Sequence, residues 1–239
     1  MTLPRKEILK ECTKPDEMLL LLDQAELLLK SWEVTWSDFV SAPLKEELIR
    51  LFSPIHDINW FSDGGYPSSE RQRMTCLREE SNVSPKETAP LAGINLEGNF
   101  LFDKATSEDF RITLHKMGVQ AGSIGDIRVR GDRGAHVICT PQAALHLNGM
   151  TKKIRDIEIR CEKESLNNLE FPFHKIPKRF NTVEASKRID AIASAGFGVS
   201  RNKIITQIKA GKVRLNWMTI KQASKELTVG DSIQLEGKG

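Results

Sequence analysis

Hydrophobic and polar positions along this chain change their spacing twice, and each change marks a new predicted unit. Residues 1–54 have the 3.6-residue period of amphipathic helices. One helix follows Pro15, and a second is predicted from Pro43, a favourable first-turn residue, to about Phe52. Charged residues interrupt the apolar positions of the first helix, so we do not expect a membrane span. The pattern predicts an N-terminal helical region.

Residues 55–164 contain short segments of strand length and two helical segments. Strands are predicted at 57–61 and 73–77, on either side of the turn Asp63-Gly64-Gly65-Tyr66-Pro67. The order that follows is strand 91–97, helix 107–117, strand 126–130, strand 135–139, helix 141–147 and strand 154–161. This β-α-β-β-α-β order predicts a ferredoxin-like or RRM-like α/β sandwich, so the expected fold class is α+β.

Residues 165–181, which include two prolines, are predicted to be a linker into a third unit at 182–239. Thr182 is a suitable N-cap for a helix over 183–197, and Ser200 for a second helix over 201–209. Gly211 would end that second helix. Alternation then predicts strands with one face at Val213, Leu215 and Trp217, and further positions at Ile233 and Leu235 after a turn.

Charge is divided unevenly between these units. Residues 173–239 carry 13 lysines and arginines against 5 aspartates and glutamates, a balance of +8. Residues 1–172 carry 22 against 27, a balance of −5, so the overall +3 conceals a basic C-terminal unit. This asymmetry favours a polyanionic partner, although a solvated basic face would give the same count.

The motifs of the third unit point to a family. Arg188-x-Asp190, Ser200-Arg201-x-Lys203, Ile208-x-x-Gly211-x-Val213-x-x-Asn216 and Gly230-Asp231-x-Ile233 resemble the S4 RNA-binding domain in order and spacing. Such a domain grips structured RNA mainly through shape and backbone contacts. The resemblance implies RNA contacts at Arg188, Ser200, Arg201, Lys203, Lys209, Gly211, Lys212, Arg214, Asn216 and Lys221.

Some of these residues have alternative interpretations. Arg188 could form an ion pair within the unit, with Asp190 or with Asp231. Gly211 and Asn216 could be turn residues with a purely structural role.

The resemblance extends over nearly the whole chain. The helical start, Phe61-x-Asp63-Gly64-Gly65-Tyr66 with Glu70-Arg71-x-Arg73, Gly125-Asp126-Ile127 and the S4-like unit together resemble the YlmH family. The segment after Tyr66 is most similar to its cyanobacterial and plastid branch, the photosystem II S4 domain proteins. Bacterial relatives act on ribosomes, including large subunits stalled with peptidyl-tRNA. The resemblance therefore implies ribosomal RNA, tRNA and the ribosome or its large subunit as partners.

A second group of residues is a candidate for an additional RNA contact: Gly64, Gly65, Arg71, Arg73, Arg128 and Arg130. The glycines permit a tight turn, and the arginines after it could bind phosphate. The alternative is a structural hairpin with Tyr66 packed against the body. RRM-type binding needs aromatic residues on the sheet, and the predicted strands offer few.

The sequence contains no signature of catalysis or of a cofactor. It has no phosphate-binding loop of the GxxxxGK[ST] type, no GxGxxG, no HExxH and no GxSxG. His136 and Cys139 are better explained by chance than by a metal site, and four widely spaced cysteines suit a reducing compartment. We expect a monomeric, cytoplasmic, non-catalytic RNA-binding protein with no cofactor and no metal. Two alternatives remain open: an RNA-modifying enzyme of the pseudouridine-synthase type or its remnant, and a photosystem II assembly factor.

Overall fold

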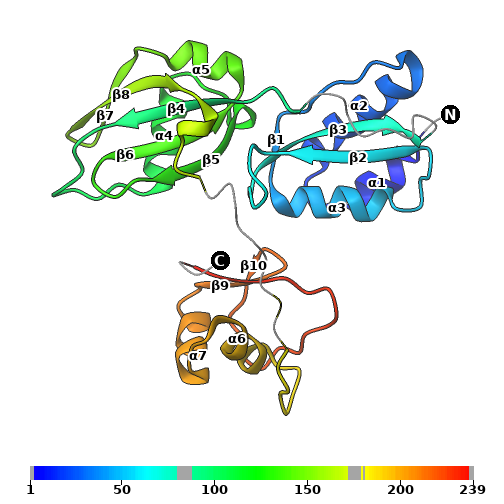
Figure 1. Ribbon diagram of the computed structural model, residues 1–239. Coiled ribbons are helices and arrows are strands. Elements are labelled where there is room, and N and C mark those ends of the chain that lie inside the picture. Colours follow the sequence, from blue (N-terminus) through cyan, green and yellow to red (C-terminus); the bar gives the residue numbers. More distant parts are fainter. Residues whose placement is uncertain (1–2, 80–87, 172–178, 180, 237–239) are drawn as a thin grey trace. The chain divides into compact units, whose positions relative to one another are not determined.

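The computed structural model describes residues 3–79, 88–171, 179 and 181–236 (Figure 1). The chain forms two compact units, residues 1–175 and 176–239, and each is described by itself. The first unit contains an N-terminal lobe and a middle domain, each with its own sheet and hydrophobic core. The second unit is the C-terminal module. The α+β fold class is confirmed.

The N-terminal lobe packs three helices against a small antiparallel sheet of order β1-β3-β2. Its elements are α1 (Arg5–Glu11), α2 (Pro15–Ser31), β1 (Phe39–Val40), α3 (Ala42–Phe52), β2 (Ile58–Asp63) and β3 (Gln72–Arg78). Both predicted helices are present, each with a proline in its first turn. Buried leucines of α2 and α3 meet Ile58, Met74 and Cys76 of the strands.

The hairpin β2–β3 completes the sheet of the N-terminal lobe, whereas the sequence pattern assigned it to the middle domain. β3 pairs with β1, with Phe39 opposite Arg73. The hydrophobic residues of the hairpin join the core formed by α1, α2 and α3. A boundary at residue 54 therefore divides this sheet. Local periodicity predicts strands but cannot identify their partners across a long separation.

The middle domain is a five-stranded antiparallel sheet of order β5-β6-β4-β8-β7, with two helices on one face. Its elements are β4 (Ala92–Glu97), α4 (Ser107–Lys116), the 3-10 helix η2 (Ala121–Ser123), β5 (Ile124–Val129), β6 (Gly134–Cys139), α5 (Pro141–Leu147), β7 (Thr151–Ile154) and β8 (Ile157–Glu164). Without β7 the order is that of the predicted ferredoxin-like sandwich. The predicted strand 154–161 corresponds to β8, but it begins at Ile157, because Arg155 turns the chain at φ 54° and joins β8 in a hairpin to the additional strand β7.

The face of this sheet opposite the helices is partly covered by the chain itself. The segment after β8, which includes the 3-10 helix η3 (Leu166–Asn168), buries Leu169 and Phe171 against Ile138 of β6. The backbone N–H of Glu170 donates to Nδ1 of His136 at 2.8 Å. Residues 165–171 are therefore packed on the sheet and not a linker. The rest of the predicted linker, apart from residues 179 and 181, lies outside the described residues.

The C-terminal module packs two helices on a three-stranded antiparallel sheet of order β10-β9-β11. Its elements are α6 (Ile189–Phe197), α7 (Arg201–Lys209), β9 (Val213–Leu215), β10 (Met218–Thr219) and β11 (Ile233–Leu235). Ile189, Ile204, Ile208, Val213 and Leu235 form its core.

Two local predictions for this module were wrong. The first helix begins at Ile189 and not at residue 183, because the preceding segment is extended. Its backbone pairs with a later loop, through Ile189 N to Lys225 O at 2.8 Å and Leu227 N to Lys187 O at 2.9 Å. The strand after α7 ends at Leu215, because Trp217 lies in a turn at φ 67°.

Candidate nucleic-acid interface

A buried carboxylate holds two of the predicted RNA-binding arginines. Asp190, at the start of α6, is only 1% exposed. Arg188 donates from Nε and Nη2 to its two oxygens, both at 3.1 Å. Arg201 donates to the same two oxygens at 3.0 and 3.2 Å. The alternative of an Arg188–Asp190 ion pair is therefore what the structure shows, and Arg201 joins it.

The sequence of α7 explains why Arg201 reaches this carboxylate. Arg201 lies three, four and seven positions before the isoleucines of the helix, so it occupies their core-facing side at its N-terminal end. Ser200 starts the helix as expected, since its Oγ accepts from the N–H of Lys203 at 3.3 Å. α6 and α7 pack side by side in the core of the module, which brings Asp190 within reach.

The electrostatics of this cluster follow from its contacts. Burial alone would raise the pKa of Asp190, but the hydrogen bonds from Arg201 and Arg188 outweigh burial and hold that pKa below its ordinary value. The hydrogen bond that Arg201 donates to Asp190 also raises the pKa of Arg201. Arg188 and Arg201 keep 40% and 50% of their side-chain surface exposed. Asp190 therefore holds both guanidiniums in place, and their exposed edges can still bind an anion.

The remaining basic candidates lie on the surface of the module. Lys203 and Lys209 occupy the solvent-facing side of α7, where Asn202 and Thr206 are also exposed. Lys212, Arg214 and Lys221 are also exposed, and Nζ of Lys212 is 4.0 Å from Glu236. Lys225 is a further exposed cation that the motif comparison did not single out. A phosphate backbone would find several cations here without displacing core contacts.

Two predicted contacts have a structural role in the module. Gly211 has φ 74°, the conformation that lets it end α7. Asn216 has φ 48°; its Nδ2 donates to Asp231 at 2.8 Å, and its Oδ1 accepts from the N–H of Ser232 at 2.9 Å. Both therefore shape the turns that carry the basic surface.

The second group of candidates is mostly structural. The Arg73 guanidinium donates to the carbonyl oxygens of Ser37, Trp36 and Pro90, and the residue is only 9% exposed. Arg71 donates to the carbonyls of Ile124, Phe39 and Ala121. The expectation that these two guanidiniums bind phosphate is corrected, because backbone carbonyls already accept their hydrogen bonds.

The glycine turn and Arg130 also support the fold. Gly65 has φ 88°, and a Cβ at Gly64 would collide with the Ser69 side chain and the carbonyl oxygen of Arg71. Arg130 donates to Glu170 and Asn95 and keeps only 14% of its side-chain surface exposed. Arg128 differs: it is exposed on β5, and within the described part of the chain its guanidinium forms no hydrogen bond or ion pair.

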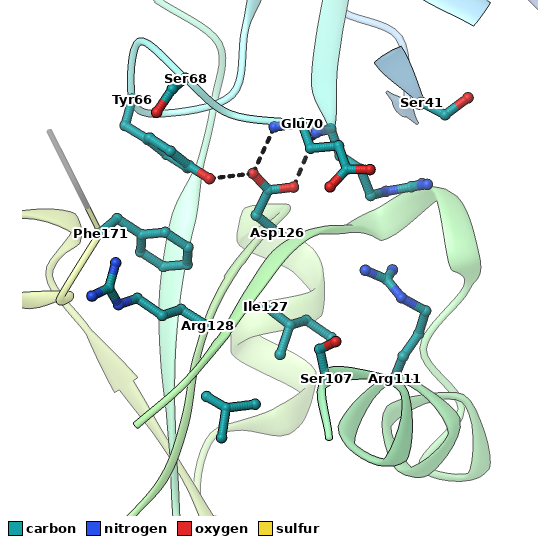
Figure 2. A pocket seen from close by; sticks show the side chains of 12 residues that line it. Ser41, Tyr66, Ser68, Glu70, Ser107, Arg111, Asp126, Ile127, Arg128 and Phe171 are labelled. Atoms are coloured by element: carbon teal, nitrogen blue, oxygen red, sulfur yellow. Dashed lines mark hydrogen bonds between the residues drawn. The ribbon is translucent and has the colours of Figure 1, made fainter. Parts of the chain in front are cut away.

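Tyr66 and Asp126 join the N-terminal lobe to the middle domain (Figure 2). The two oxygens of Asp126 accept three hydrogen bonds: from the Tyr66 hydroxyl at 2.5 Å, and from the N–H groups of Glu70 at 2.8 Å and Arg71 at 3.0 Å. The Tyr66 ring packs against Phe171 with ring centroids 5.1 Å apart. The hairpin alternative for this turn, with Tyr66 packed on the body, is therefore what the structure shows.

Comparisons with known proteins match the two ends of this architecture. The family described as YlmH, N-terminal matches residues 14–81, and the S4 domain family matches residues 187–233. The ribosome-associated protein quality control protein P2 of Bacillus subtilis is 25% identical over 222 residues, which cover 91% of this chain and 83% of that protein. The predicted resemblance to the YlmH family of S4-domain proteins is confirmed.

A solved structure agrees with the fold of this chain. The cell division protein ylmH from Streptococcus pneumoniae aligns with a TM-score of 0.50 and 18% identity, covering 67% of this chain and 98% of that one. The match at 14–81 also includes the β2–β3 hairpin, in agreement with its place in the N-terminal lobe. The cyanobacterial and plastid branch stays a prediction.

The potential metal ligands and thiols of the described residues are dispersed or largely buried. They contain no group of three or more His, Cys, Asp or Glu side chains arranged to hold a metal ion. His136 and Cys139 lie three residues apart on β6 and so face opposite sides of the sheet. Burial raises the pKa of Cys76 and Cys139 to about 12, which keeps these thiols protonated near neutral pH. Among the described helices, none has the length and apolar character needed to cross a membrane.

Proposed function

We propose that this protein is a non-catalytic RNA-binding protein that docks on structured ribosomal RNA or tRNA, on the ribosome or its large subunit, through the C-terminal module. The observation that carries the proposal is the basic surface of α6 and α7: an arginine pair fixed by Asp190, next to a helix whose open side presents Lys203 and Lys209. Fixed guanidiniums suit the phosphate backbone, because less side-chain freedom is lost on binding.

The comparisons support the same assignment at a coarser level. The S4 domain match covers both helices and the turns of the module. The relative from Bacillus subtilis is named as ribosome-associated. The arrangement of the middle domain argues against RRM-type reading of RNA, because Leu169 and Phe171 cover part of the sheet face that an RRM would use.

The test is RNA binding by the full chain as a function of salt. Purified large ribosomal subunits, free ribosomal RNA and tRNA are titrated with wild type and with the variant Lys203→Gln/Lys209→Gln. Each phosphate neutralised contributes about −0.7 to −0.9 to the slope of log K against log salt, so the variant should lose about 1.4 to 1.8 of that slope and about tenfold in affinity.

The matched control is Lys152→Gln/Lys153→Gln, which removes two exposed lysines of β7 in the middle domain. We expect it to keep nearly all of the affinity and the salt slope. Equal losses in the two variants would mean that net charge alone drives binding and would refute the assigned surface. Mass spectrometry of nucleosides after incubation with RNA tests the non-catalytic part, since any new modification would contradict it.

A further inference from the structure

We propose that a cleft in the first unit is a second RNA-binding site, which takes an unpaired stretch of RNA with its phosphates at Arg111 and Arg128. The cleft has a volume of about 660 Å³ and lies between the turn at Tyr66–Arg71, β5 and the start of α4. The inference rests on the proposed function, because it assigns a further contact to the same ligand class.

The two arginines reach the cleft from different elements. Arg111 comes from α4 and Arg128 from β5, and Figure 2 shows them on opposite sides of Asp126 and Ile127. Among the described residues, Arg111 has two long polar contacts, to the carbonyl of Gly125 at 3.3 Å and to Glu108 at 4.0 Å. Arg128 has no hydrogen bond or ion pair within the part of the chain that the structure describes. Both guanidiniums can therefore bind an anion without breaking a strong internal contact.

Of the two carboxylates in the cleft, that of Asp126 already has its hydrogen-bond donors. Three donors from the neighbouring turn occupy the two oxygens of Asp126. Three arginines and two carboxylates line the cleft, a formal balance of +1. Arg71 and Arg111 are close enough to repel each other: after burial, Arg111 is the next largest cause of the lowered pKa of Arg71. An anion at Arg111 would relieve that repulsion.

The other lining groups suit a nucleotide better than an isolated anion. Ser41, Ser68 and Ser107 contribute hydroxyl groups, and the Ser41 Oγ is buried with no hydrogen-bond partner in the described structure. Phe171, Ile127 and Val129 form an apolar wall that a base can contact. Guanidiniums and hydroxyls for the backbone, beside an apolar wall for a base, are the combination that single-stranded RNA sites use.

A second contact on the same molecule would also have an energetic advantage. Once the C-terminal module is bound, the first unit meets the same RNA at the effective concentration set by the chain between them. A weak cleft can then contribute measurably to affinity. An acidic peptide would meet the same arginines, and the experiment separates it from RNA.

The experiment crosslinks the full chain to large ribosomal subunits whose RNA carries 4-thiouridine and maps the modified peptides. We expect crosslinks in the peptides that contain Tyr66 or Phe171, in addition to those of the C-terminal module. The variant Arg111→Gln/Arg128→Gln should lose the cleft crosslinks and about fivefold to tenfold in affinity. The control Arg133→Gln/Arg160→Gln removes two arginines whose side chains are 62% and 66% exposed. This control should keep the cleft crosslinks and the affinity of the wild type.

Crosslinks confined to residues 188–236, with unchanged affinity of the Arg111/Arg128 variant, would overturn the inference and leave the proposed function intact. A parallel reaction with a chemical protein–protein crosslinker tests the acidic peptide: protein crosslinks at the cleft in place of RNA crosslinks would also overturn the inference. The proposed function fails separately if Lys203→Gln/Lys209→Gln binds like wild type. Equal thermal unfolding of all variants shows that the losses are not due to misfolding.

Discussion

Asp190 and Arg201 are eleven residues apart in the sequence, yet Nε of Arg201 lies 3.0 Å from Oδ2 of Asp190. Arg188 binds the same carboxylate, so one buried acid orders two surface cations. The consequence is that Arg201 serves both the fold of the module and its positive surface. Loss of RNA binding in an Arg201 variant would therefore not by itself identify a phosphate contact.

The first prediction concerns Asp190→Asn. The amide removes the negative charge and leaves two guanidiniums with a weaker partner. We expect the C-terminal module to lose about 1–2 kcal/mol, less than for a fully buried pair, because both arginines remain about half exposed and can turn to water. Hydrogen–deuterium exchange at α6 and α7 measures this loss. Glu184→Gln, an exposed acid of the same module, should leave exchange unchanged.

The same residue predicts an acid-sensitive module. The pKa of Asp190 is lower in the folded state than the ordinary value of about 4, so its stabilising effect is present above that pH and is lost as pH falls through the lowered pKa. The free energy of unfolding of the wild type, measured by urea denaturation, should fall below about pH 4. For Asp190→Asn it should depend less on pH in this range. An identical pH dependence in the two proteins would contradict the role given to Asp190.

Much of the middle domain could be predicted from sequence, because its helices and strands have clear periods and clear turns between them. The buried face of α7 could also be predicted, since Ile204, Ile205 and Ile208 recur at helical spacing, whereas the contact of Arg201 with Asp190 was not predicted. The hydrogen-bond partners of Arg73 could not be predicted from the sequence. The three carbonyls that accept from its guanidinium come from distant loops, and no local pattern records where those loops pass.

The start of α6 shows a second reason why a local sequence pattern can misplace an element. Thr182 and Glu184 have the character of a helix N-terminus, and the apolar spacing from residue 185 fits a helix. The backbone between Lys187 and Ile189 instead pairs with Lys225 and Leu227, more than thirty residues later. Long-range pairing outweighed a local preference worth only tenths of a kcal/mol per residue.

The second prediction concerns Tyr66, the only tyrosine of the chain. Burial and the carboxylate of Asp126 raise its pKa. Because the folded state keeps the proton longer than the unfolded state, stability should fall as pH rises above about 10, the ordinary tyrosine pKa. Absorbance at the tyrosinate band should show ionisation only together with unfolding.

Tyr66→Phe is the matched control for this titration. It removes the hydroxyl and its 2.5 Å hydrogen bond but keeps the ring against Phe171. We expect a loss of about 1–2 kcal/mol at neutral pH and a smaller decline of stability in alkali. Ionisation of Tyr66 at its ordinary pKa in the folded protein would show that the bond to Asp126 does not persist in solution.

The third prediction separates a structural arginine from an RNA contact. Arg73→Lys keeps the charge but cannot donate to three carbonyls in the directions that the planar guanidinium reaches. We expect the first unit to lose about 2–3 kcal/mol, because three partly buried carbonyls lose hydrogen bonds from a charged donor. RNA affinity measured well below the unfolding temperature should stay within about twofold of wild type. A large loss of affinity without a loss of stability would restore Arg73 as a phosphate contact.

The fourth prediction concerns the turn at Asn216 and Trp217, whose φ values of 48° and 67° match a two-residue hairpin loop between β9 and β10. Asn216→Gly accepts this conformation but loses the hydrogen bonds to Asp231 and Ser232. Asn216→Ala loses the same bonds and also adds the strain of a positive φ. We expect both variants to be less stable than wild type, with alanine about 1 kcal/mol worse than glycine. The difference in stability between the two variants, measured by thermal unfolding, gives the free-energy cost of placing a residue with a Cβ at this positive φ. If both variants kept wild-type stability but lost RNA affinity equally, Asn216 would be a direct RNA contact, and the structural role assigned to it here would be wrong.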